Sequence, residues 1–112
     1  MAFDAKPSTW LGSGYSVASN AAVFNTSSHG TPCLTQLTDA QANATTGDIR
    51  IVARALLYKL AAAWDATAVA DRPGKMRIRK TSGLNSVTGT VTETYNIEFD
   101  VAITTLGTVT TE

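Results

Sequence analysis

The segment 75–103, KMRIRKTSGLNSVTGTVTETYNIEFDVAI, decides the fold of this chain. Apolar and polar residues alternate over most of 75–80 and again over most of 91–103, which is the period of strands that bury one face. Between these two runs, residues 83–89 begin and end with glycine and predict a hairpin loop. The sequence therefore predicts two antiparallel strands, with the whole hairpin spanning 75–104.

The charges of the two strands indicate how they pair. Two registers keep the apolar faces together, one with Arg77 opposite Glu98 and one with Arg77 opposite Asp100. A slip by one residue would place basic side chains against apolar ones. The basic row of the first strand, which also contains Lys75 and Arg79, is therefore expected to form a cross-strand charge ladder.

The segment 46–68 predicts the main helix. The helix must end before Pro73, because proline disfavours helical structure in the residue that precedes it. Thr46 is the expected N-cap, and apolar residues recur after it at three- and four-residue steps. This stripe consists of Ile49, Val52, Ala53, Leu56, Leu60, Ala63 and Trp64. A second, partly apolar face carries Ile51, Ala55, Tyr58 and Ala62, so two interpretations stay open. The helix either has an ordinary polar edge or lies between its own sheet and a second subunit.

The ends of the chain predict arms. Residues 1–36 predict an extended arm with short strands near Thr9–Leu11, Tyr15–Ala18 and Ala21–Phe24, and residues 105–112 predict a C-terminal arm. These arms are expected to complete the sheet or to reach a neighbouring subunit. The spacing of Thr38 and Gln41 fits a capping box and a short helical turn before the main helix. The resulting fold class is α+β in a single domain, residues 1–112: one long helix packed on a small antiparallel sheet built around the hairpin, with extended terminal arms.

The net charge of zero hides a separation of charge along the chain. Eight of the nine basic residues and only two acidic ones lie between Arg50 and Lys80, a net charge of +6, and the remainder carries −6. If residues 75–80 form a strand, its row of basic side chains would face the acidic side chains of the following strand. Four basic residues remain on the helix and the turn, and their expected partners are residues of the arms, the preceding loop or solvent. The basic residues are Arg50, Arg54, Lys59 and Arg72, and the candidate acids are Asp4, Asp39 and Glu112.

No pattern in the sequence predicts a catalytic centre, a metal site or a cofactor site. His29 and Cys33 share a loop, but two ligands are too few for a structural zinc site and no further ligand pattern accompanies them. The pair is interpreted as an incidental histidine and a small semi-buried thiol. No apolar run approaches the roughly 20 residues of a membrane span, and the start of the chain lacks the apolar core of a secretory signal.

Composition favours contacts between copies of the chain. The sequence contains 18 threonines, and charged residues make up 16%, below the usual share of about 25%. A surface of few charges and many hydroxyls suits packing against neighbours. The candidate apolar anchors for such an interface are Trp10, Tyr15, Ile51, Tyr58 and Trp64.

The stretch from Gly47 to Val101 resembles small structural proteins of phages and phage-like particles. It reads GDIRIVARALLYKLAAAWDATAVADRPGKMRIRKTSGLN and returns in the Thr-rich strand TGTVTETYNIEFDV. The resemblance covers about half of the chain and lies in the style and order of the elements. It implies a coat or decoration protein with extended arms. In the RNA phage coat family the helices usually follow the strands, whereas here the main helix precedes the hairpin, so no RNA-hairpin site is carried over.

These observations together predict a non-enzymatic, self-assembling structural protein, a viral or phage capsid or virion component. It would be made in the host cytoplasm, and its partners would be copies of itself and other virion proteins, with no membrane and no cofactor. One alternative is a coat protein that also binds RNA through Lys75, Arg77 and Arg79. Another is a small monomeric adaptor domain, which predicts no assembly.

Overall fold

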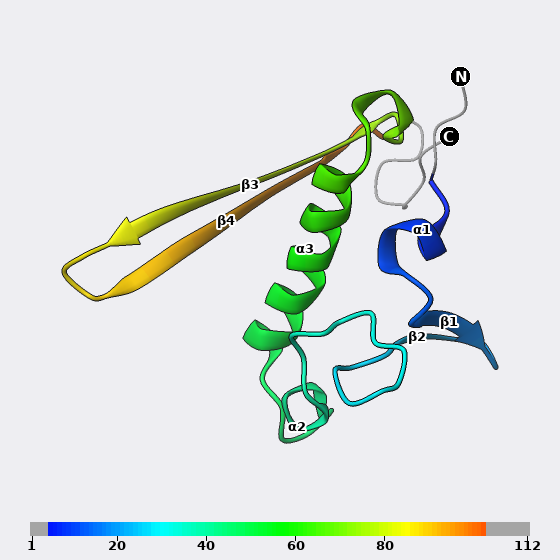
Figure 1. Ribbon diagram of the computed structural model, residues 1–112, viewed down its shortest axis with the longest axis horizontal. Helices are drawn as coiled ribbons and strands as arrows, with labels where there is room; N and C mark the ends of the chain where they lie inside the picture. Colours follow the sequence, from blue (N-terminus) through cyan, green and yellow to red (C-terminus); the bar gives the residue numbers. More distant parts are fainter. Residues whose placement is uncertain (1–4, 103–112) are drawn as a thin grey trace.

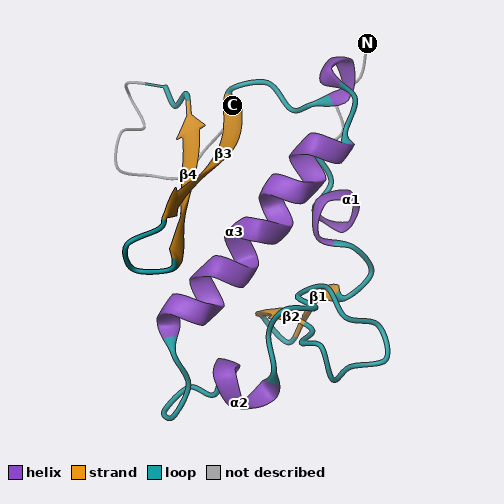
Figure 2. Ribbon diagram, turned by 60° about the vertical axis from the view of Figure 1, so that its left-hand side comes forward, coloured by secondary structure: helices purple, strands orange, loops and turns teal. Residues whose placement is uncertain are grey.

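The computed structural model describes residues 5–102 and has an α+β architecture. A long helix, α3 (Ile49–Ala66), runs through the middle of the molecule (Figure 1). The N-terminal elements α1 (Pro7–Leu11), β1 (Tyr15–Ala18) and β2 (Ala21–Phe24) lie on one side of it. The hairpin of β3 (Met76–Asn85) and β4 (Thr90–Phe99) projects from the other side. Figure 2 shows the same arrangement turned by 60°.

The N-terminal segment differs in part from the predicted arm. The two strands at Tyr15–Ala18 and Ala21–Phe24 are confirmed, but they pair with each other instead of completing the sheet of β3 and β4. Ser19 and Asn20 connect them with φ angles of 53° and 64°, the geometry of a type I′ turn. The strand expected near Thr9–Leu11 is wrong, because Pro7 at the first helical position begins α1 there.

The main helix begins later than predicted, at Ile49, and its cap is Asp48 and not Thr46. The Asn43 side chain accepts hydrogen bonds from the backbone N–H groups of Thr45 and Thr46, at 2.9 and 3.0 Å, and holds this segment in a turn. Gly47 then passes so close to the preceding backbone that an added Cβ would lie 2.3 Å from the Gln41 oxygen. The helix can therefore start only after this tight passage.

The other features expected around the main helix are largely confirmed. Thr38 and Gln41 form the predicted capping box, which starts α2 (Asp39–Ala42). The main helix ends at Ala66, where the Thr67 hydroxyl donates to the Ala63 carbonyl at 2.7 Å. A short 3₁₀ helix, η1 (Val69–Asp71), leads to the turn before β3.

The core is small and lies mainly between α3 and the loop after β2. Cys33, Leu34, Leu37 and Ala55 are buried together, and Phe24, Ala42, Ile51, Val52 and Leu56 pack against them. A second contact joins α1 to the C-terminal half of α3, where the Trp10 and Trp64 rings lie 5.8 Å apart. Ile49, expected in the buried stripe, is exposed because it is the first residue of the helix.

The β3–β4 hairpin confirms the predicted pairing with Arg77 opposite Glu98. Both strands are longer at the tip than expected, because Asn85 closes the turn by accepting hydrogen bonds from the N–H groups of Val87 and Thr88. The second strand ends at Phe99, short of the predicted Ile103, and one more cross-strand bond follows it, from the Asp100 N–H to the Lys75 carbonyl. Ile103 and the predicted C-terminal arm lie outside the described residues.

Candidate functional site

The predicted basic row lies on the face of β3 that points away from α3. Arg77 donates to Glu98 at 2.9 Å and to both oxygens of Asp100 at 3.0 and 2.9 Å. The Asp100 contact is the largest cause that raises the pKa of the Arg77 guanidinium, and the same contact lowers the pKa of the Asp100 carboxyl. Arg79 faces Asn96. The predicted charge ladder is therefore confirmed at its centre, and its exposed position limits its contribution to stability.

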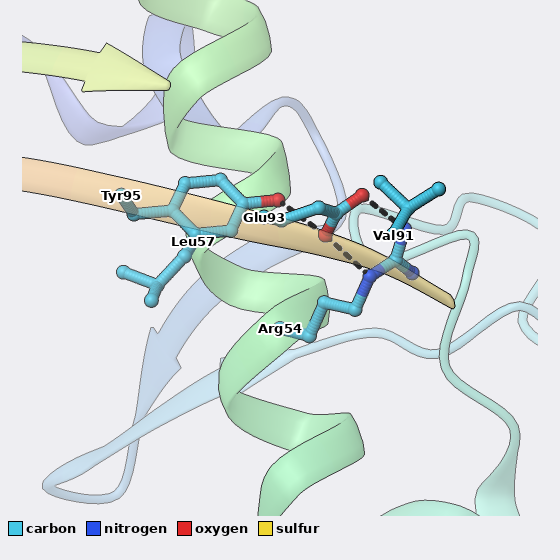
Figure 3. Close-up of a pocket in the computed structure, with 5 residues that line it drawn as sticks. All are labelled: Arg54, Leu57, Val91, Glu93 and Tyr95. Carbon is cyan, nitrogen blue, oxygen red and sulfur yellow. Dashed lines mark hydrogen bonds and ion pairs between the residues drawn. The ribbon is translucent and has the colours of Figure 1, made fainter. Parts of the chain in front are cut away.

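The opposite face of the hairpin meets α3 through a group of polar side chains, which we call the clamp. The clamp consists of Arg54 and Tyr58 from α3, Lys80 from β3, and Glu93 and Tyr95 from β4. Arg54 donates two hydrogen bonds to the Glu93 carboxylate, at 2.7 and 2.9 Å, and the Tyr95 hydroxyl donates a third at 3.1 Å (Figure 3). Lys80 lies 4.5 Å from the centre of the Tyr58 ring and 3.9 Å from the carboxylate.

The electrostatics of the clamp centre on Glu93. The hydrogen bonds from Arg54 lower the pKa of the Glu93 carboxyl to about 2, and the Tyr95 hydroxyl and the Lys80 charge act in the same direction. Burial and the neighbouring carboxylate raise the pKa of the Tyr95 phenol. Arg54, Glu93 and Tyr95 are thus held in the ionisation states that they have at neutral pH, and the arrangement stabilises the orientation of the hairpin on the helix.

The clamp overturns one expectation from the charge pattern. The expected partner of Arg54 is an acid of the arms, an acid of the loop before the helix, or solvent, but its partner lies in β4. A signal was present in the sequence. Lys80 is two residues from Ile78 and Glu93 is two residues from Tyr95, so each charged residue lies on the same face of its strand as an apolar one. A charged side chain on the helix-facing side of a strand needs an opposite charge on the helix.

Arg50 and Arg72 also have partners within the described chain. Arg50 bonds to the N-cap residue Asp48 at 2.6 Å and lowers the pKa of that carboxyl to about 2. Arg72 lies 4.8 Å from the centre of the Trp64 ring and donates to the Trp64 and Thr67 carbonyls at the end of α3. Carboxylates of the same chain therefore partner Arg50, Arg54, Arg77 and Lys80, in part neutralising the basic segment.

Two open pockets border the long helix. One, of about 500 Å³, lies beside the clamp and is lined by Arg54, Leu57, Val91, Glu93 and Tyr95. The other, of about 410 Å³, lies between α1, α3 and the start of β3, and its lining is mainly apolar. Neither pocket combines a nucleophile with a base in the way an acyl- or phosphoryl-transfer site requires.

The predicted interface anchors all make contacts within the chain. Trp10 and Trp64 contact each other, Tyr15 packs on Phe24 with ring centres 5.2 Å apart, and Ile51 packs against the core. Trp10 retains only 5% of its surface, so it adds little area to any contact between copies. The apolar side chains that remain widely exposed near the hairpin tip are instead Leu84, Val87 and Val91, at 77%, 94% and 58%.

His29 and Cys33 do not meet as a catalytic pair. The His29 ring accepts a hydrogen bond from the Thr31 backbone N–H at 2.9 Å, whereas Cys33 is buried in the core. Over residues 5–102, no three metal-binding side chains gather in one place. Within the same range, no helix has the length and apolar character needed to cross a bilayer.

Comparison of the chain with protein-family models, with curated proteins and with solved structures found no match.

Proposed function

We propose that this protein is a non-enzymatic structural subunit that assembles with copies of itself, as a capsid or other virion component does. The observation that carries the proposal is the distal half of the β3–β4 hairpin, residues 81–94. Every residue of this segment except Glu93 is exposed, and α3 borders it only on the side of Val91 and Glu93, while its tip projects away from the other described elements in Figure 1. A two-stranded hairpin is marginal on its own, so this element is suited to support from a second chain.

The dimensions of the molecule support the same proposal. Its radius of gyration is 16.0 Å, whereas a compact chain of this length has a value of about 13 Å. The larger radius of gyration reflects a projecting hairpin and a core that is divided into small clusters. A chain that buries little of its own apolar surface gains stability when a neighbour covers the remainder.

The test is the mass of the purified protein over a range of concentrations. Light scattering coupled to size-exclusion chromatography is expected to show multiples of the 11.8 kDa chain, and negative-stain microscopy is expected to show uniform particles or oligomers. A monomer at all concentrations would refute the proposal and would favour the adaptor interpretation.

A hairpin variant and a matched control test whether the distal hairpin is the part of the chain that assembles. Leu84→Ser with Val87→Ser should weaken assembly while the circular dichroism of the chain stays unchanged. Val69→Ser is the matched control, because Val69 is equally exposed but belongs to η1. If the control weakens assembly as much as the hairpin variant, the hairpin is not the assembling element.

The alternative of an RNA-binding coat protein has one observation in its favour. Arg79 faces the neutral Asn96, so its charge is not cancelled across the strands. Arg77, by contrast, is held by two carboxylates, which repel phosphates. Absorbance of the assembled fraction at 260 and 280 nm separates the two functions. A nucleic-acid spectrum that disappears in Arg77→Ala/Arg79→Ala, with stability unchanged, would establish RNA binding in place of the ladder.

A further inference from the structure

The outer edge of β4 presents a row of backbone groups that no residue of 5–102 bonds. Asp100 donates its N–H to the Lys75 carbonyl at 2.9 Å, so this pair is hydrogen-bonded across the hairpin. Hydrogen-bonded and non-bonded pairs alternate in antiparallel strands. The backbone groups that point outward from β4 are therefore those of Val91, Glu93, Tyr95, Ile97 and Phe99.

Nothing in the described chain covers this edge. The sheet contains only β3 and β4, and no described residue bonds to the outward backbone groups of β4. Proteins usually guard such edges with proline, bulges or lysines. Thr90–Phe99 contains none of them, and its pairing with β3 is continuous. Its residues, mostly threonines, β-branched and aromatic side chains, are those that favour strands.

The outer edge of β3 is less suited to the same pairing. Lys80 lies on that edge next to Arg79, and Gly83 interrupts the distal half. A lysine on an outer strand guards it against pairing with a copy of itself. Of the two edges, that of β4 is therefore the one able to pair.

The outward residues also determine which register is possible. In a two-fold pairing of β4 with its own copy, odd-numbered residues must face odd-numbered residues. An axis at Glu93 would place two carboxylates opposite each other, which is unfavourable. Axes at Tyr95 or Asn96 would place this carboxylate opposite Ile97 or Phe99. An axis at Thr94 avoids all of these contacts.

We propose that two copies of this chain join antiparallel along the outer edges of β4, with Thr94 facing Thr94 of the second copy on the two-fold axis. This register pairs Val91 with Ile97 of the second copy and places Glu93 opposite Tyr95 of the second copy. The two-stranded sheets become one four-stranded sheet in the order β3-β4-β4-β3. The inference rests on the proposed self-assembly and names the surface that begins it.

The pocket beside the clamp supports this arrangement. Its walls include the side chains of Val91, Glu93 and Tyr95, whose backbone groups face the second copy in the Thr94 register. Figure 3 shows these three residues along β4, with α3 behind them. Pairing of the edges extends the wall of this pocket, and the contact has the same surface on both sides, as a closed dimer requires.

A single cysteine tests the proposal. Thr94 belongs to a pair that is hydrogen-bonded toward β3, so on its other side it faces the second copy in a non-bonded pair. Cα atoms of such pairs lie about 4.5 Å apart, within the range of a disulfide. Thr94→Cys is expected to form a covalent dimer in oxidised glutathione, seen on a non-reducing gel.

Two controls make the result specific. Thr81→Cys places the thiol directly across the hairpin from Thr94 on the same face and should stay monomeric on the gel. The unchanged protein, whose Cys33 is buried, gives the background. In the non-covalent assay, Thr94→Lys should raise the dimer dissociation constant roughly two- to fivefold, because like charges then face each other, whereas Thr81→Lys should not.

The outcomes separate this inference from the proposed function. Oligomers in solution without a Thr94→Cys cross-link would overturn the edge pairing and leave self-assembly intact. Equal cross-linking of Thr81→Cys would also overturn it. A monomer in every assay would overturn both proposals. Slow hydrogen exchange of the outward β4 amides in a monomer would mean that the chain covers its own edge, which also contradicts the pairing.

Discussion

Replacing Ile78 by alanine should separate the part of the hairpin that the fold stabilises from the part that it leaves to a neighbour. Ile78 retains 7% of its surface and is the buried residue of β3. Leu84 lies on the same strand and the same face but is 77% exposed. The two substitutions remove similar apolar groups from one strand, so their difference measures packing.

The magnitude for Ile78→Ala follows from its burial. The change removes three carbon atoms, each worth about 0.8 kcal/mol when buried, so the transfer term is about 2 kcal/mol. The cavity left behind adds to this, which gives an expected loss of roughly 2–4 kcal/mol. Leu84→Ala should change the unfolding free energy of the isolated chain by no more than about 0.5 kcal/mol.

Urea unfolding measures both values, with the fluorescence of Trp10 and Trp64 as the probe, since their contact breaks on unfolding. The protein is held at its lowest workable concentration, so that assembly does not contribute. Equal losses for Ile78→Ala and Leu84→Ala would refute the reasoning, because the distal hairpin would then be packed within a single chain.

Three further results are expected. Because the pKa of Glu93 falls from 4.5 to about 2 on folding, the stability from this group is present above pH 4.5 and is lost as the pH falls toward 2. Glu93→Gln should therefore flatten this part of the acid-unfolding curve, and an unchanged slope would contradict the clamp. Gly47→Ala should cost roughly 1–3 kcal/mol, because its Cβ meets backbone. Gly30→Ala, with open space around it, should be neutral or stabilising by up to about 1 kcal/mol, and thermal melts compare the two.

The hairpin and its register could be predicted because alternation and charge agreed on them. A one-residue slip exchanges the two faces of a strand, so the pattern around Arg77 left only two registers. The two short strands on either side of Ser19 and Asn20 were predictable from the turn between them, although their pairing with each other was not. In both places, neighbouring residues alone determine the structure.

The start of α3 and the clamp could not be read from local pattern in the same way. Thr46 is a good cap by type, but Asn43 takes its backbone N–H and Gly47 meets the backbone of Gln41. The pairing of Arg54 with Glu93 joins residues 39 positions apart and depends on how the hairpin leaves the turn after α3. Such contacts follow from tertiary geometry, which the periodicity of a single element does not contain.

The position of Glu93 connects the two surfaces of β4. Its side chain holds the hairpin on α3, and its backbone groups point to the open edge. Without Arg54, a carboxylate on that edge would repel its own copy and would guard the strand against pairing. When the Arg54 guanidinium is bound, the charge of Glu93 is neutralised and its carboxylate points toward the helix. The backbone groups of the edge then stay available for pairing, and the carboxylate no longer repels a second copy. The clamp therefore both orients the hairpin and makes the outer edge of β4 compatible with a second copy.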